Sequence, residues 1–204
     1  MKSSASSLAK SLCLSAFFYT VALVGLSTPP AHAAETINKP NIIVIMGDDV
    51  GYGDVSCNGA TAITTPNIDA LAEQGLRFTS GYCSASTCTP TRYSFLTGSY
   101  AFRKKGTGIA APTAPAIIQP GTATIASLLR EAGYNTAVVG KWHLGLGGPN
   151  GPDWNGELNP GPLEIGFDTC FLLPTTNDRV PQVFVEDHRV KPCRYMGQAK
   201  QEIY

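Results

Sequence analysis

The sequence lacks an excess of charge of either sign. It contains 15 lysine and arginine residues against 15 aspartate and glutamate residues in a chain of 204. Nucleic acids and anionic membrane surfaces bind proteins with a basic balance, which this chain does not have. An internal repeat and a low-complexity tract are also absent from the sequence. We therefore expect no nucleic-acid partner and no repeat architecture.

The sequence also lacks an apolar run suited to crossing a membrane in the mature protein. The run Leu12 to Leu26 is too short to be read as a spanning helix. Two lysines precede it, and Ala31-His32-Ala33 follows it as a cleavage site. This order is typical of a secretory signal peptide. We therefore expect residues 1–33 to be a signal peptide, with export to the periplasm or out of the cell.

The remaining residues, 34–204, are enough for one domain with a hydrophobic core. Asn41 to Met46 is a continuous run rich in β-branched residues that ends at Gly47-Asp48-Asp49, and Asn135 to Val139 is a second run that ends at Gly140. Such runs are typical of buried strands in a parallel sheet. The predicted fold class is therefore α/β, a mostly parallel sheet with helices on both faces.

Helices and further strands are predicted between and after these runs. Helix starts, apolar spacing and closing glycines indicate helices over residues 65–75 and Thr124 to Ala132. Strands are predicted over Leu76 to Tyr82 and Val183 to Val185. The segment Gly147 to Pro162, rich in glycine, proline and asparagine, is predicted to be a long loop that forms a rim or a lid.

Polar side chains follow the two predicted buried strands. The carboxyl ends of parallel strands share the edge of a sheet where ligands bind. Asp48 and Asp49 offer hard oxygen ligands there, which suit Ca²⁺ or Mg²⁺; the alternative is that they only begin a turn. Alternation places Lys141 and His143 on one side of an extended segment. The alternative for this second pair is a solvated lysine and a hydrogen-bonded surface histidine.

The stretch Thr87 to Gly98 holds the candidate nucleophile. Proline at a first helical position and Gly98 at the far end predict a short helix over Pro90 to Thr97, with Thr89 as its cap. Cys88 would then lie just before a helix N-terminus, where backbone N–H groups and Arg92 favour an anion. The alternative is a structural cysteine, as is usual in exported proteins.

Three stretches resemble one family in order along the chain. Cys88-Thr89-Pro90-Thr91-Arg92 with Leu96-Thr97-Gly98 resembles the signature of the formylglycine-dependent sulfatases. The run from Asp48 to Asp54 resembles the metal loop of that family, and Gly140-Lys141-Trp142-His143-Leu144-Gly145 resembles its second signature. The resemblance implies an alkaline-phosphatase-like fold and the hydrolysis of sulfate esters.

The resemblance also implies a role for each matching residue. In this family the signature cysteine is oxidised to formylglycine by a formylglycine-generating enzyme or an anaerobic sulfatase-maturing enzyme, so Cys88 would provide the nucleophile. Asp48, Asp49 and residue 88 would hold Ca²⁺ or Mg²⁺. The substrate would be a sulfated small molecule or a sulfated polysaccharide.

The implied mechanism begins with one hydroxyl of the hydrated aldehyde, which attacks sulfur while the alcohol or phenol of the substrate leaves, and this forms a covalent sulfate ester. Arg92 would orient this hydroxyl, Lys141 would bind the sulfate oxygens, and His143 would hydrogen-bond the formylglycine hydroxyl. The second hydroxyl then loses its proton and expels sulfate, which regenerates the aldehyde. An unmodified thiol has no second hydroxyl, so protein with an intact Cys88 should not turn over.

The sequence departs from the family in its second half. The family takes a further Asp-Asn type pair, a lysine and a histidine from a later part of the catalytic domain, and nothing after Gly145 matches them. We therefore expect residues 34–204 to be an N-terminal part of a sulfatase catalytic domain. Two other functions stay open: a phosphodiesterase or phosphonate monoester hydrolase of the same superfamily, and a non-catalytic binding protein derived from a sulfatase.

The resemblance also bears on the cysteines. Four cysteines remain in the mature chain when Cys88 is modified: Cys57, Cys83, Cys170 and Cys193. An even number could form disulfides in an oxidising compartment, and all four could equally be free thiols.

Overall fold

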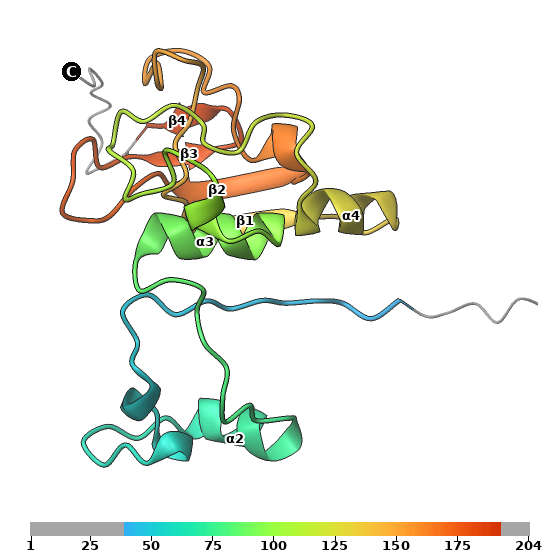
Figure 1. The fold of residues 1–204 in the computed structure, drawn as a ribbon, viewed down its shortest axis with the longest axis vertical. Coiled ribbons are helices and arrows are strands. Elements are labelled where there is room, and N and C mark those ends of the chain that lie inside the picture. Colours follow the sequence, from blue (N-terminus) through green and yellow to red (C-terminus); the bar gives the residue numbers. More distant parts are fainter. Residues whose placement is uncertain (1–38, 193–204) are drawn as a thin grey trace, which may run out of the picture. The chain divides into compact units, whose positions relative to one another are not determined.

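The computed structural model describes residues 39–192, and the predicted signal peptide lies outside them. Residues 47–192 belong to one compact unit, which is separate from the residues before Gly47. Figure 1 shows the order of the elements along the chain. No helix of residues 39–192 is both long and apolar enough to span a membrane.

The sheet of the compact unit has four strands in the order β1-β2-β3-β4. Their bounds are Ala137–Lys141 (β1), Thr169–Leu173 (β2), Phe184–Glu186 (β3) and Arg189–Lys191 (β4). β1 and β2 are parallel, with Lys141 opposite Leu173, whereas β2, β3 and β4 pair antiparallel. The sheet is therefore mixed in the part of the chain that the structure describes, because β3 and β4 form a hairpin. The predicted strands over 135–139 and 183–185 are confirmed as β1 and β3 within two residues, but β1 is mostly exposed where a buried strand was expected.

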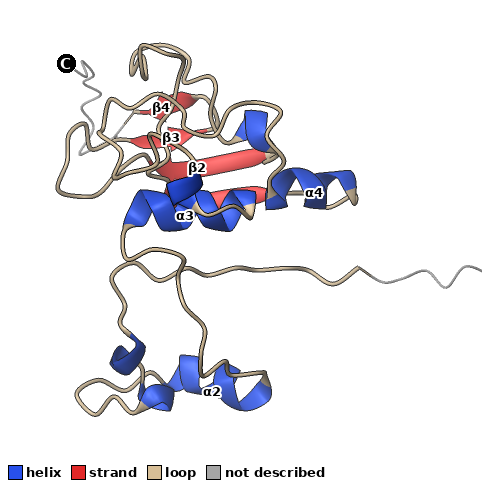
Figure 2. Ribbon diagram, in the orientation of Figure 1, coloured by secondary structure: helices blue, strands red, loops and turns tan. Residues whose placement is uncertain are grey.

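Three α-helices form where the capping signals predict them (Figure 2). They are Pro66–Gln74 (α2), Cys88–Thr97 (α3) and Ile125–Glu131 (α4). Thr124 caps α4, since its side chain accepts a hydrogen bond from the N–H of Ser127 at 3.0 Å. Single 3₁₀ turns lie at Tyr52–Asp54 (η1), Ser56–Asn58 (η2), Ala101–Arg103 (η3) and Leu163–Ile165 (η4).

Two predicted strands are wrong. Asn41 to Met46 has no regular secondary structure, and the side chains of Ile43 and Ile45 are 83% and 85% exposed. Leu76 to Tyr82 is also irregular and exposed. A strand needs a hydrogen-bonded neighbour as well as a suitable composition, and neither segment pairs with any of the four strands of the sheet.

The core lies between one face of the sheet and the loops and helices that cover it. Cys170 and Leu172 of β2 and Val185 of β3 point into this core, and Trp142, Leu144 and Leu146 enter it after β1. The long loop 147–162 also contributes, because Leu158 is fully buried and its N–H donates to the carbonyl of His188 at 2.8 Å. The long loop is therefore anchored beside the β3–β4 hairpin at Leu158.

Candidate active site

Cys88 is the first residue of α3. Thr87 has an extended backbone and is the N-cap, so the helix begins two residues earlier than predicted. The predicted cap, Thr89, lies inside the helix and is buried; its hydroxyl donates to the carbonyl of His143 at 2.8 Å and accepts from the N–H of Ala110 at 3.1 Å. These two bonds explain the difference, because they tie Thr89 to segments far away in the sequence. The end of the helix is as predicted, with Gly98 left-handed at φ 66°.

Lys141 lies between Cys88 and Asp48. It is the last residue of β1, and its Nζ is 3.2 Å from the Sγ of Cys88. The same ammonium group is 2.7 Å and 3.0 Å from the two carboxylate oxygens of Asp48. Residues 48, 88 and 141, which the sequence places in three separate motifs, therefore meet at one point.

Arg92 of α3 also contacts both Lys141 and Asp48. It lies one turn after Cys88, and its Nη1 donates to the carbonyl of Lys141 at 2.5 Å. Its Nη2 is 3.5 Å from the Oδ1 of Asp48. The guanidinium group therefore joins α3 to the end of β1 and adds a second positive charge beside Asp48.

The ion pair between Lys141 and Asp48 determines the protonation state of both side chains. The hydrogen bond from Lys141 lowers the pKa of Asp48, although partial burial of the carboxylate opposes the shift. Burial also works against the charge of Lys141, but its hydrogen bonds to Asp48 and Cys88 outweigh it and raise the pKa of the ammonium group. Both groups are therefore charged at neutral pH.

His143 lies deeper than the other predicted site residues. Its side chain is buried, and its Nε2 is 3.0 Å from the carbonyl oxygen of Ala110. Since a carbonyl only accepts, Nε2 carries the proton. Burial lowers the pKa of His143, so the ring is neutral at pH 7, and its buried Nδ1 has no hydrogen-bond partner within residues 39–192. Nδ1 is thus an acceptor without a donor; the predicted bond to residue 88 stays a prediction.

A cavity of about 540 Å³ adjoins these groups. Its walls contain Asp48, Asp49, Cys88, Lys141, Leu173, Thr176, Asn177, Asp178 and Arg179. The polar stretch 177–179 also lies in this wall. Leu173 and Thr176 were missed, although Leu173 is the parallel partner of Lys141, and the rule that ligands gather at the carboxyl ends of parallel strands would have found it.

Arg179 connects the cavity with the buried histidine. Its Nη1 donates to the carbonyl oxygen of Ala110 at 3.1 Å, the same atom that binds Nε2 of His143. The loop around Ala110 is thereby fixed from both sides. No local sequence signal predicts this role of Ala110, because only its backbone takes part.

The carboxylates at the cavity fit a divalent cation in part. Asp48 and Asp49 both line the cavity with Cys88, and their oxygens are the ligands that Ca²⁺ and Mg²⁺ prefer. However, residues 39–192 contain no group of three or more histidine, cysteine, aspartate or glutamate side chains placed to hold a metal ion. The described residues therefore provide only part of a coordination shell.

The described cysteines are free thiols: Cys57, Cys83, Cys88 and Cys170. Cys193 lies outside the described residues. Burial raises the pKa of Cys170 to about 11, so this core thiol is unreactive at neutral pH. Cys88, by contrast, lies in the wall of the cavity.

Comparisons with known proteins agree with this geometry. The sulfatase family profile matches residues 40–184. An N-acetylgalactosamine-6-O-sulfatase of Bacteroides thetaiotaomicron is 53% identical over 152 residues, which are 74% of this chain and 30% of that protein. A steryl-sulfatase of Mus musculus is 38% identical over 177 residues, 82% of this chain and 27% of that protein. The chain thus spans less than a third of the length of either relative.

Two solved structures are also similar. One, described with the metabolism of multiple glycosaminoglycans by Bacteroides thetaiotaomicron, has a TM-score of 0.74 and 52% identity, and the match covers 76% of this chain and 32% of that chain. The crystal structure of Ps i-CgsB has a TM-score of 0.52 and 34% identity, and the match covers 68% of this chain and 29% of that chain. Both support the predicted α/β, alkaline-phosphatase-like fold, present here in part. With the site and the family match in agreement, the chain belongs to the sulfatase family.

Proposed function

We propose that this protein is a hydrolase of sulfate esters that acts at the cavity beside Cys88. The observation that carries the proposal is the meeting of Cys88, Lys141 and Asp48 within 3.2 Å contacts, with Arg92 behind them. A sulfate group is a tetrahedral anion, and two fixed cations beside a nucleophile position are suited to bind it.

We further propose that Cys88 is converted to formylglycine by a formylglycine-generating enzyme or an anaerobic sulfatase-maturing enzyme. The modified residue would supply an oxygen nucleophile at the N-terminus of α3. The support is the motif around Cys88 and the position of its sulfur in the cavity wall.

Lys141 and Arg92 have distinct tasks in this proposal. The ammonium group of Lys141 donates to the atom at residue 88 and to Asp48, so it can contact a sulfate oxygen and the nucleophile together. Arg92 fixes the carbonyl of Lys141 and thereby the end of β1. Both charges oppose the negative charge that grows on the sulfate oxygens as the ester bond breaks.

His143 is proposed to accept a hydrogen bond at Nδ1. This atom is buried without a partner in the described part of the chain, and such an atom costs free energy unless a donor reaches it. The ring is held by Ala110 and by burial, so it is oriented before the substrate arrives.

Asp48 and Asp49 are proposed to hold Ca²⁺ or Mg²⁺ as part of a larger shell. A bound cation would supply a further positive charge for the sulfate oxygens. Its presence is supported by the hard oxygen donors that these two residues bring to the cavity wall.

The proposed substrate is a sulfated glycan. The N-acetylgalactosamine-6-O-sulfatase relative and the structure described with glycosaminoglycan metabolism, both above 50% identity, support this class. Lysine, arginine, asparagine and aspartate side chains in one wall suit a ligand that carries both charge and hydroxyl groups.

The experiment that tests the function compares three proteins expressed with a maturing enzyme: the wild type, Cys88→Ala and Cys88→Ser. Turnover of 4-nitrophenyl sulfate and of an aryl phosphate diester is measured, before and after chelation and readdition of Ca²⁺ or Mg²⁺. Mass mapping of the tryptic peptide 78–92 reports whether residue 88 is an aldehyde. We expect sulfate turnover only from the wild type with the aldehyde.

Other outcomes separate the alternatives. A clear preference for the phosphate diester would indicate a phosphodiesterase of the same superfamily. An aldehyde at residue 88 without turnover of either ester would indicate a binding protein and would contradict the proposed function.

A further inference from the structure

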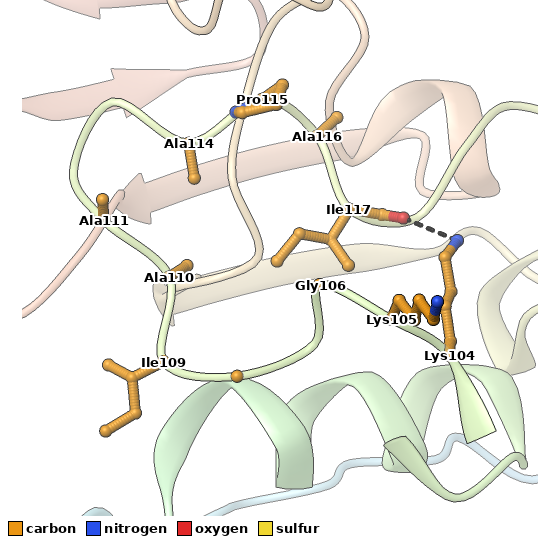
Figure 3. A pocket seen from close by; sticks show the side chains of 11 residues that line it. Lys104, Lys105, Gly106, Ile109, Ala110, Ala111, Ala114, Pro115, Ala116 and Ile117 are labelled. Carbon is orange, nitrogen blue, oxygen red and sulfur yellow. Dashed lines mark hydrogen bonds between the residues drawn. The ribbon is translucent and has the colours of Figure 1, made fainter. Parts of the chain in front are cut away.

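A second cavity of about 460 Å³ lies in the loop 104–117 (Figure 3). Its walls are small or apolar except at one end, where Lys104 and Lys105 lie. No carboxylate lines it. Figure 3 shows the side chain of Ile117 pointing inward, whereas Ile109 points away from the cavity. The cavity is within the size range of small-molecule sites.

The two lysines of this cavity differ in what they contact. The Nζ of Lys104 donates to the carbonyl of Ile117 at 3.0 Å and lies 5.7 Å from the ring centre of Tyr93. These contacts close the neck of the loop, so Lys104 is structural. Lys105 is exposed and has no hydrogen-bond or ion-pair partner anywhere in residues 39–192. Its positive charge is therefore available to a ligand.

One residue, Ala110, connects the wall of the second cavity with a residue in the wall of the first. Ala110 lines the second cavity, and its carbonyl oxygen binds Arg179, which lines the first. A ligand longer than one unit could therefore contact both cavities. A chain of sulfated sugars has this length, an anionic group on successive units, and apolar ring faces suited to alanine and isoleucine side chains.

We propose that the second cavity is a subsite for a neighbouring anionic sugar of a sulfated glycan, with Lys105 binding its sulfate or carboxylate group. The proposal rests on the proposed function for the identity of the glycan, because the reacting sulfate ester would lie in the first cavity. Gly106 and Gly108 expose backbone in the wall, and an added Cβ at Gly108 would meet no atom within 4 Å. The sugar therefore has open space beside the loop.

The test measures binding with the full chain carrying Cys88→Ala, so that no turnover occurs. The probes are a chondroitin 6-sulfate tetrasaccharide and N-acetylgalactosamine 6-sulfate. The dissociation constant of each is measured by isothermal titration calorimetry at low salt. Lys105→Ala is expected to weaken binding of the tetrasaccharide about tenfold, as one charge-assisted contact would. Binding of the monosaccharide should not change, since it reaches only the first cavity.

Arg103→Ala is the matched control. It removes the same charge two residues away, and Arg103 is exposed but does not line the cavity. Equal losses in Arg103→Ala and Lys105→Ala would indicate a general effect of surface charge and would overturn the subsite. Gly108→Phe fills the open space without removing charge, and it should also weaken only the tetrasaccharide.

The subsite and the proposed function fail in different ways. If the Cys88→Ala chain with no other substitution binds the tetrasaccharide no more tightly than the monosaccharide, there is no subsite, whatever turnover of aryl sulfates the wild type shows. Loss of binding in Lys105→Ala and Gly108→Phe, in a protein that hydrolyses no sulfate ester with residue 88 modified, would support the subsite while contradicting the proposed function.

Discussion

At the scale of single residues, the site depends on one lysine that makes contacts from three directions. The ammonium group of Lys141 contacts both oxygens of Asp48 and the sulfur of Cys88, and its carbonyl accepts from Arg92. Its side chain is only 11% exposed, whereas that of Asp48 is 46% exposed, so water reaches the ion pair from the side of the carboxylate. No other side chain in the described chain contacts both Cys88 and Asp48.

The first prediction concerns this lysine. Lys141→Met keeps most of the length of the side chain and removes its charge, so Asp48 retains only Arg92, at 3.5 Å. We expect the kcat for 4-nitrophenyl sulfate to fall about 100-fold or more, as for the loss of a preorganised group that stabilises charge. Arg103→Ala, outside the first cavity, serves as the control and should leave turnover unchanged. A loss smaller than about threefold in Lys141→Met would exclude a catalytic role.

At the scale of elements, glycines fix how the segment after β1 meets the loop 104–117. Gly145, in the second sulfatase-like motif, has φ 70°, and an added Cβ would lie 2.0 Å from the carbonyl oxygen of Pro115. The backbone of this segment is paired with the loop, because Leu146 donates to Ala114 and Ile117 donates to Leu144. Glycine is therefore required at position 145 for two reasons: the backbone of Pro115 lies too close for a Cβ, and the backbone conformation is left-handed.

The second prediction separates these two roles of glycine. Gly121 has φ 81° but open space around its added Cβ. Gly121→Ala should lower the free energy of unfolding by about 1–2 kcal/mol, the cost of a left-handed alanine. Gly145→Ala should lower it by roughly a further 2 kcal/mol or more, because the backbone must move. Chemical denaturation measures both, and equal losses would mean that the close approach has no energetic role.

The third prediction concerns the link between the residue before β1 and the start of β2. The Oδ2 of Asp168 accepts from the N–H of Thr136 at 2.7 Å and from its hydroxyl at 3.0 Å. The backbone hydrogen bond from Thr136 lowers the pKa of Asp168 below its usual 3.8. The stabilisation is therefore present above about pH 3.8 and is lost as pH falls through the folded-state pKa.

Asp168→Asn should accordingly lower the melting temperature at pH 7. The difference from the wild type should shrink as the pH falls below about 3.8, where the wild-type carboxylate of the unfolded chain is already protonated. Thermal unfolding followed by circular dichroism between pH 3 and pH 7 gives both curves. A difference that stays constant over this range would show that the carboxylate charge contributes nothing.

At the scale of the whole molecule, the compact unit covers only one face of its sheet well. Cys170 and Leu172 alternate with exposed residues along β2, and the far side carries Val139, Phe171 and Phe184, which are 76%, 40% and 46% exposed. The rings of Phe171 and Phe184 are stacked with their centres 5.5 Å apart. An exposed apolar group of this kind is unusual for a folded domain in water.

The fourth prediction follows from this face. The folded chain should bind the dye 8-anilinonaphthalene-1-sulfonate, and the double variant Phe171→Ser with Phe184→Ser should bind much less. The melting temperature should change little, because both side chains are partly in water already. If dye fluorescence is undiminished in the double variant, the dye binds at a different surface and the prediction is wrong. Leu172→Ala, in the buried row of the same strand, should instead lower the melting temperature strongly.

The sequence by itself determined those features that depend on neighbours along the chain. Capping residues and glycines predicted α2, α3 and α4, and the apolar runs predicted β1 and β3, because helices and turns are decided over a few residues. The three motifs also identified the family, together with the residues that meet at the cavity.

Only the tertiary structure decided the features that depend on partners far away in the sequence. The segment Asn41 to Met46 has the composition of a buried strand, yet it has no strand beside it in the described chain, and composition does not supply a partner. Thr89, predicted as a cap, instead links α3 to the carbonyl of His143 by a hydrogen bond. The backbone carbonyl of Ala110 is hydrogen-bonded to the side chains of both His143 and Arg179. Contacts between distant segments are set by packing in three dimensions, and no local pattern records them.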